Sequence, residues 1–165
     1  MIYIIRHREG NADTNCLSKY GIERSIDIAK TFNTVERLNI HTCLPNATYY
    51  DSNSSMMTIF KHIRPLETAS IVSSHMNKPL HLIENDDEFP SSRDGGHHLI
   101  VWHHKDIHNI LQLYFYDAKF DWDDNDYDGC IVLDKYYWEF KPNYIKKNRF
   151  KQLCMNVARW IKHTI

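Results

Sequence analysis

Near its start the chain reads Ile2-Tyr3-Ile4-Ile5-Arg6-His7-Arg8-Glu9, an apolar run that stops abruptly at charged side chains. The run is rich in β-branched residues and does not alternate between apolar and polar, which is typical of a strand buried on both faces in a parallel sheet. A polar loop follows, and Ser18 can cap a helix whose apolar positions keep helical spacing, at Ile22, Ile26, Ala29 and Phe32. The beginning of the chain therefore predicts a strand, a loop and a helix.

The same alternation continues along the chain. Apolar spacing predicts helices over residues 65–76, 107–114 and 150–161, and strands over residues 79–83, 98–102, 130–133 and 136–140. Residues 39–62 show no clear pattern apart from a possible short strand at 47–50. The order of elements predicts one α/β domain over residues 1–165, a three-layer domain with a mostly parallel sheet flanked by helices.

Composition and charge narrow the class of protein. The 165 residues are 42% hydrophobic and 13% aromatic, which is typical of a globular chain and excludes a disordered one. A net charge of −1 gives no global field toward nucleic acid or a membrane surface, and no apolar run approaches the ~20 residues of a membrane span. The four cysteines are far apart and form no CxxC pair, which favours a reducing compartment. We therefore expect a cytoplasmic protein with no nucleic-acid or membrane partner.

Arginines and histidines stand where the predicted strands end or the helices begin. Arg6 and His7 follow the first strand, Arg64 opens a helix, and His103 and His104 follow a later strand. Ligands of α/β sheets bind beyond the carboxyl ends of the strands, so these side chains are expected to converge. Guanidinium groups and helix N-termini both bind phosphate oxygens. The sequence therefore predicts an anion site, with phosphate as its natural ligand.

Four stretches also carry a known pattern in a known order: Ile4-Ile5-Arg6-His7-Arg8-Glu9, Leu17-Ser18-Lys19-Tyr20-Gly21-Ile22-Glu23-Arg24, Ile63-Arg64-Pro65-Leu66-Glu67-Thr68-Ala69 and Ile100-Val101-Trp102-His103-His104-Lys105-Asp106-Ile107. They resemble the opening Arg-His-Gly-Glu motif, the Leu-Ser/Thr-x-x-Gly-x-x-Arg segment, the Arg-x-x-(Gln/Glu)-Thr-Ala helix start and the second-histidine strand of the histidine phosphatase superfamily, the phosphoglycerate mutase-like group. The last stretch is most similar to a branch with Trp-Glu-His-x-x-Ile at that strand end. The resemblance covers roughly residues 1–134.

The resemblance implies a role for each residue of the predicted anion site. His7 would attack phosphorus to give a phosphohistidine, while Arg6, Arg64 and the second histidine would hold the transferring oxygens. The Trp-Glu-His pattern makes His104 the phosphate-facing histidine and leaves His103, also in the phosphate site, at the glutamate position. Water would then hydrolyse the intermediate, with no metal and no cofactor.

Two features depart from the family pattern or are not specified by it. Arg8 stands where glycine or alanine is usual, and its long side chain would crowd the pocket or extend it. The leaving oxygen needs a proton from a general acid. Glu88 ranks first among the candidates, which are Asp86, Asp87, Glu88 and Asp106.

Several residues also have a second interpretation. The alternative to an anion-binding role for Arg64 is a surface ion pair with Glu67. Glu9 is either a pocket carboxylate or a solvated charge, and Arg24 is expected to be structural. A group of histidines could in principle bind zinc, since His104 and His108 are four residues apart. The group consists of His97, His98, His103, His104 and His108. Against zinc, the Glu of a His-Glu-x-x-His motif is absent and Lys105 lies beside the site.

Two charged segments suggest other ligands less well. Residues 124–129 match the first half of a calcium loop, but the twelfth position is Lys135 and a strand follows, so a solvated acidic loop is the better interpretation. The basic stretch 141–151 is better explained as the solvated face of the C-terminal helix than as a nucleic-acid surface.

The function that follows is a metal-independent phosphatase acting on a phosphomonoester, either a phosphorylated small molecule or a phosphoprotein. A mutase is less expected because the chain is short and has no long insertion to close over a small bisphosphate. A phosphate-binding module without turnover and a metal-dependent hydrolase remain the alternatives. Substrate specificity is expected in the loops at 10–16, 51–62 and 84–97.

Overall fold

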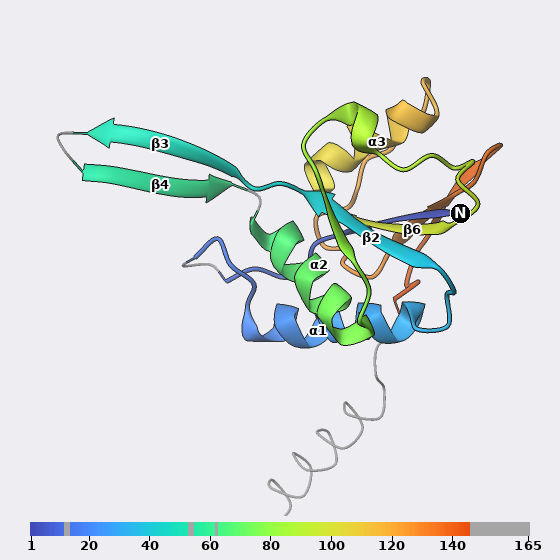
Figure 1. The fold of residues 1–165 in the computed structure, drawn as a ribbon, viewed down its shortest axis with the longest axis horizontal. Coiled ribbons are helices and arrows are strands. Elements are labelled where there is room, and N and C mark those ends of the chain that lie inside the picture. The colour runs from blue at the N-terminus through green and yellow to red at the C-terminus, as the bar shows by residue number, and fades with distance from the viewer. Residues whose placement is uncertain (12–13, 53–54, 62, 146–165) are drawn as a thin grey trace, which may run out of the picture.

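The computed structural model describes residues 1–165 except 12–13, 53–54, 62 and 146–165. Its central sheet consists of β1 (Ile2–Arg6), β2 (Leu38–Cys43), β5 (Leu80–Ile83), β6 (His97–Trp102), β7 (Cys130–Leu133) and β8 (Trp138–Lys141). The helices are α1 (Lys19–Phe32), α2 (Ile63–Met76) and α3 (Ile107–Tyr114), with short 3₁₀ turns η1 (Asp86–Glu88) and η2 (His104–Asp106). A separate hairpin of β3 (Asn46–Ser52) and β4 (Ser55–Lys61) extends away from the sheet (Figure 1).

The sheet is mostly parallel, as predicted. Its strand order is β5-β2-β6-β1-β7-β8, and the first four strands run parallel to one another. β7 and β8 complete the sheet as antiparallel strands. β1 and β6 are neighbours with Arg6 opposite Trp102, so the residues that follow both strands emerge together at one edge.

Helices cover both faces of this sheet and make the predicted three layers (Figure 1). On one side, Phe32 of α1 and Val72 of α2 pack in one cluster with Ile5. On the other side, Ile107 of α3 packs with Ile4. Alternate residues of β1 thus enter two different cores, which is why the strand shows no polar face.

The sequence pattern missed β2 because half of its side chains are polar. His41 and Thr42 are nevertheless buried, since each finds a partner on β6. The His41 Nε2 lies 3.1 Å from Nδ1 of His98, and the Thr42 hydroxyl donates to the carbonyl of Val101 at 2.9 Å. The predicted strand at 47–50 belongs to the hairpin, and β8 begins at Trp138 instead of residue 136. The predicted helix at 150–161 lies outside the described residues.

A buried ionic network ties the loop after β1 to α1 and to the start of β7. Arg8 is fully buried, with its Nη1 3.4 Å from Oδ1 of Asp128. Arg24 of α1 pairs with the same carboxylate and, at 3.2 Å, with Oε1 of Glu9. Arg24 is therefore structural, as expected, and Glu9 pairs with it. Arg8 points into this network, so it neither crowds nor extends a ligand pocket as the sequence suggested.

Asp128 supplies the negative charge shared by two buried guanidinium groups, so Asp128→Asn should destabilise the fold strongly. Removing one partner of a buried pair costs about 3–5 kcal/mol because the remaining charge is left uncompensated. The matched control is Glu139→Gln, which breaks the half-exposed pair with Lys141 and should change the free energy of unfolding by less than about 1 kcal/mol. Urea unfolding of the two variants measures the difference, and equal stabilities would contradict this role of Asp128.

Candidate active site

His7 lies at the point where β1 ends and is held there by backbone and side-chain contacts. Its backbone N–H donates to the carbonyl of Trp102 at 2.9 Å, and its ring is 1% exposed. The ring nitrogen Nδ1 lies 2.7 Å from the carbonyl oxygen of Arg8, and because a carbonyl only accepts, Nδ1 carries the proton. Nε2 is buried and has no hydrogen-bond partner among the described residues. His7 therefore has one unprotonated ring nitrogen, which is the form of imidazole nitrogen that can act as a nucleophile.

The surroundings keep this imidazole neutral. Burial, followed by the positive charges of Arg64 and Arg6, lowers the pKa of His7 to about 3, although the hydrogen bond to the Arg8 carbonyl acts in the opposite direction. A neutral imidazole is the reactive form in nucleophilic catalysis.

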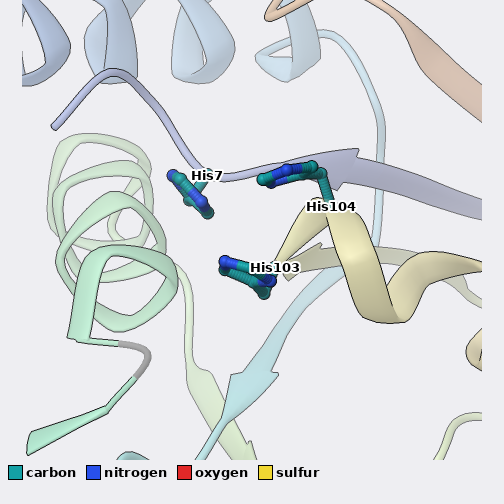
Figure 2. Close-up of side chains that lie close together, drawn as sticks. All are labelled: His7, His103 and His104. Atoms are coloured by element: carbon teal, nitrogen blue, oxygen red, sulfur yellow. The ribbon is translucent and has the colours of Figure 1, made fainter. Parts of the chain in front are cut away.

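His103 and His104 both face His7 (Figure 2). The ring of His103 stacks on His7 with centroids 5.4 Å apart, and the ring of His104 lies edge-on at 5.9 Å. The 3₁₀ turn η2 that begins at His104 brings the two neighbours to the same side. The structure thus brings together all three histidines of the predicted site. His103 and His104 both lie beside the His7 ring, so the contacts do not single out His104.

A carboxylate lies near each of these histidines. Oδ1 of Asp124 lies 2.7 Å from Nε2 of His104, and Oδ2 of Asp106 lies 3.7 Å from Nδ1 of His103. Burial, followed by the positive charge of Arg6, lowers the pKa of His104. Asp124 was missed as a site residue because it follows His104 by twenty positions, in a loop whose acidic pattern indicated only solvation.

That acidic loop also holds Arg6. Nη1 of Arg6 donates to the carbonyl of Asp124 at 2.7 Å and to that of Asp123 at 3.2 Å, and the guanidinium lies 3.8 Å above the ring of Tyr127. Nε of Arg6 is buried and has no hydrogen-bond partner among the described residues. The loop is therefore a positioning element for the site. Its carboxylate Asp126 accepts from the backbone N–H groups of Asp128 and Gly129, which fixes its shape.

Arg64 approaches the site from the first turn of α2. A Cβ atom at Gly10 would lie 2.5 Å from Nη1 of Arg64, so the absence of a side chain at Gly10 makes room for this guanidinium. Glu67 does not form the alternative ion pair with Arg64 among the described residues, because its Oε2 accepts from the backbone N–H of Leu17 at 2.6 Å.

Other motif residues hold the loops in place. The Thr68 hydroxyl accepts from the backbone N–H of Arg8 at 3.1 Å, which ties α2 to the residue after His7. Ser18 caps α1 through the N–H of Gly21 and donates to the carbonyl of Glu9 at 3.1 Å. A Cβ at Gly21 would lie 2.2 Å from that same carbonyl oxygen, so α1 packs against the loop only with glycine there.

Glu88 is not supported as the general acid. Its carboxylate is exposed and accepts from the backbone N–H of Glu84 at 2.7 Å and from the amide of Asn85 at 3.4 Å, within its own turn. The first of these hydrogen bonds lowers the pKa of Glu88, whereas a general acid needs a raised one. Asp106 and Asp124 are the carboxylates that contact the histidines of the site.

The sequence suggests His104 and His108 as zinc ligands without favouring them, and this pair is not the histidine group that the structure forms among the described residues. Among the described residues, the side chains with metal-ligand spacing are His7, His103 and His104, whose ligand nitrogens all lie within 4.8 Å of one another.

No described helix is both long and apolar enough to cross a membrane.

Among known proteins, the chain is similar to several solved structures. No protein-family model and no curated protein sequence matches the chain. A putative alpha-ribazole-5'-P phosphatase from Escherichia coli matches with a TM-score of 0.55 and 12% identity over 89% of this chain and 98% of that chain. A phosphoglycerate mutase from Plasmodium falciparum matches with a TM-score of 0.50 and 18% identity over 88% of this chain and 91% of that one.

A phosphoglycerate mutase from Bacillus anthracis matches similarly, with a TM-score of 0.50 and 12% identity over 87% of this chain and 94% of that one. At such low identity, structural likeness establishes the fold and not the activity. The chain has a phosphoglycerate mutase-like fold, which is the fold that the four stretches of its sequence predict.

Proposed function

We propose that this protein is a metal-independent phosphatase that hydrolyses a phosphomonoester through a phosphohistidine on His7. The observation that supports it best is the state of the His7 ring: its Nε2 is buried, unprotonated and without a hydrogen-bond partner among the described residues. The solved structures with a similar fold include two phosphoglycerate mutases and a putative phosphatase, which supports phosphoryl transfer as the proposed chemistry.

The chemistry requires two displacements at phosphorus. In the first, the Nε2 lone pair of His7 forms a bond to phosphorus, the P–O ester bond breaks and the leaving oxygen takes a proton from a carboxylic acid. The bond from Nδ1–H to the Arg8 carbonyl stabilises the positive charge that develops on the ring. In the second, the resulting carboxylate takes a proton from water as the water oxygen attacks phosphorus, the P–N bond breaks, and phosphate leaves with His7 and the carboxylic acid restored.

The positive charges of the site act on the transferring oxygens. The guanidinium groups of Arg6 and Arg64 stand near His7, where their positive charges lower its pKa. Fixed donors of this kind stabilise the charge that spreads over the equatorial oxygens of the transferring group. His103 and His104 complete the ring of polar groups around the proposed phosphate position.

A cleft beside η2 is the proposed place for the leaving group. It has a volume of about 690 Å³, and Asp106, which lies near His103, is one of its lining residues. Trp102 and Phe89 add aromatic surface, with ring centroids 5.3 Å apart. Phe89 belongs to the predicted specificity loop at 84–97, and this lining favours an organic leaving group with an apolar part over a bare inorganic one.

Phosphate release from p-nitrophenyl phosphate with EDTA present tests the proposal. His7→Ala should lose about 10³-fold or more in kcat because it removes the nucleophile. His104→Ala should also lose activity, whereas His108→Ala, outside the site, should match the parent. No hydrolysis by the parent, together with protection by phosphate against thermal unfolding, would instead indicate a binding module without turnover. Hydrolysis abolished by EDTA would indicate a metal-dependent hydrolase.

The identity of the general acid can be tested with two leaving groups. An alkoxide needs a proton on departure, whereas p-nitrophenolate hardly does, so the variant lacking the acid should lose more activity on an alkyl phosphate than on the aryl phosphate. The variants to compare are Asp124→Asn and Asp106→Asn. Glu88→Gln is the control, which should leave the hydrolysis rates of both the alkyl and the aryl phosphate unchanged. Equal losses on both substrates would mean that the aspartates only orient the histidines.

The pH dependence follows from the lowered pKa of His7. With that pKa at about 3 against an ordinary 6.5, protonation of His7 should cause no loss of kcat between about pH 5 and 8. The unfolded chain takes up this proton first, so the stabilisation that a neutral His7 provides is present above 6.5 and is lost as the pH falls toward 3. Urea unfolding across this range should show stability falling with pH less steeply in His7→Gln than in the parent, and identical slopes would contradict the shift.

A further inference from the structure

We propose that the imidazoles of His7, His103 and His104 form a zinc-binding site, and that Zn²⁺ bound there inhibits the phosphatase by occupying the nucleophile. The inhibitory role rests on the function proposed above, whereas the binding site rests on geometry alone. It departs from the sequence-based expectation that the protein binds no metal.

The three rings provide the ligand set. One nitrogen from each lies within 4.8 Å of the other two, and the rings gather around a common point (Figure 2). Tetrahedral zinc takes three histidine nitrogens at about 2.0–2.1 Å and leaves a fourth position open. Small side-chain rotations therefore bring the three nitrogens to bonding distance, and two of the ligands are adjacent in sequence, which fixes their relative position.

Two of the rings also have a second neighbour of the kind that orients metal-binding histidines, and a carboxylate lies near the third. Nδ1 of His7 donates to the Arg8 carbonyl at 2.7 Å, and Nε2 of His104 lies 2.7 Å from the Asp124 carboxylate. The Asp106 carboxylate lies 3.7 Å from Nδ1 of His103. Nε2 of His7 and Nδ1 of His104 remain as metal ligands, and both are buried without a hydrogen-bond partner among the described residues. Such carboxylate–histidine and carbonyl–histidine pairs set the tautomer and raise the affinity of zinc sites.

The electrostatics of the site permit a dication. A ligating nitrogen must carry no proton, and Nε2 of His7 and Nδ1 of His104 are buried where a proton would have no hydrogen-bond acceptor among the described residues. Arg6 and Arg64 add positive charge near the site, and the negative charges of Asp106 and Asp124 partly compensate it. An anion in the fourth position, such as chloride or hydroxide, neutralises the remainder and lies where the arginines bind it.

Zinc binding and phosphoryl transfer would both use the same atom, Nε2 of His7. The lone pair of the His7 Nε2 either forms the bond to phosphorus or binds the metal, so Zn²⁺ should compete with the substrate. His103 stands where the similar Trp-Glu-His pattern has glutamate, so a third imidazole is a property of this sequence. Inhibition by zinc is therefore a consequence of one residue that departs from the pattern.

Cobalt titration of the full chain, freed of metal beforehand, tests the site without reference to activity. Co²⁺ in a site of this kind should give the strong visible absorption of tetrahedral coordination, at one ion per chain, and Zn²⁺ should abolish the absorption by displacement. His103→Gln should remove the absorption, and Asp124→Asn should weaken zinc binding about 10- to 100-fold through the lost orienting contact. His108→Gln is the matched control and should bind as the parent does.

The activity measurement then tests inhibition. Added Zn²⁺ should raise the apparent KM for p-nitrophenyl phosphate, EDTA should reverse the effect, and His103→Gln should reduce the sensitivity to zinc of whatever activity it retains. Circular dichroism establishes that the variant is folded, and His7→Gln provides a second ligand deletion for the cobalt measurement.

The outcomes separate the two proposals. Hydrolysis in EDTA without cobalt binding, or cobalt binding unchanged in both ligand variants, would overturn the zinc site and leave the phosphatase intact. Cobalt binding lost in the ligand variants, with no hydrolysis in EDTA, would support the site while removing the proposed function. Activity that requires zinc would overturn the inhibitory role.

Discussion

The parallel pairing of β1 with β6 is the constraint on which the rest of the site depends. Arg6 lies opposite Trp102, and the N–H of His7 continues the ladder by donating to the Trp102 carbonyl. A shift of one residue in this register would turn the apolar side chains of β1 toward the wrong cores and separate His7 from His103. The hydrophobic burial that fixes the register of the sheet thus also fixes the distance between the imidazoles.

Four arginines near this edge divide into two pairs with different tasks. Arg8 and Arg24 are buried and share the carboxylate of Asp128, so their charge is used within the protein. Arg6 and Arg64 stand beside His7 and keep its ring neutral by adding to the effect of burial. Since Asp128 compensates the first pair, the field at the proposed phosphate position is set mainly by the second pair and by the aspartates that contact the histidines.

Sequence reasoning was most successful where a pattern is local. The apolar run of β1, the capped helix α1 and the helix starting near Arg64 were all predicted, and with them the convergence of His7, His103 and His104 at one edge of a parallel sheet. The strand and the helices depend on neighbours one to four residues apart, whose spacing is visible in a sequence. The convergence of the histidines follows from the general rule that ligand-binding residues of such sheets lie at the carboxyl ends of neighbouring parallel strands.

Residues whose environment is set by distant partners could not be placed in this way. β2 contains polar side chains that are buried only because β6 satisfies them, and Asp124 enters the site only because its loop folds over Arg6. In both cases the decisive contact joins segments that are far apart in the sequence. Glu88 differs, because its carboxylate accepts hydrogen bonds from Glu84 and Asn85 within its own turn, which the acidic pattern of the loop did not indicate.

The burial of Arg8 bears on how related sequences would vary. Arg8 and Asp128 are 120 positions apart, and replacing Asp128 alone would leave the guanidinium groups of Arg8 and Arg24 without their shared carboxylate inside the protein. Related sequences that have arginine after the histidine should therefore also keep an acid at the position of Asp128. A motif that demands glycine or alanine at that position would pass over such sequences, whereas one that accepts arginine together with a distant acid would find them.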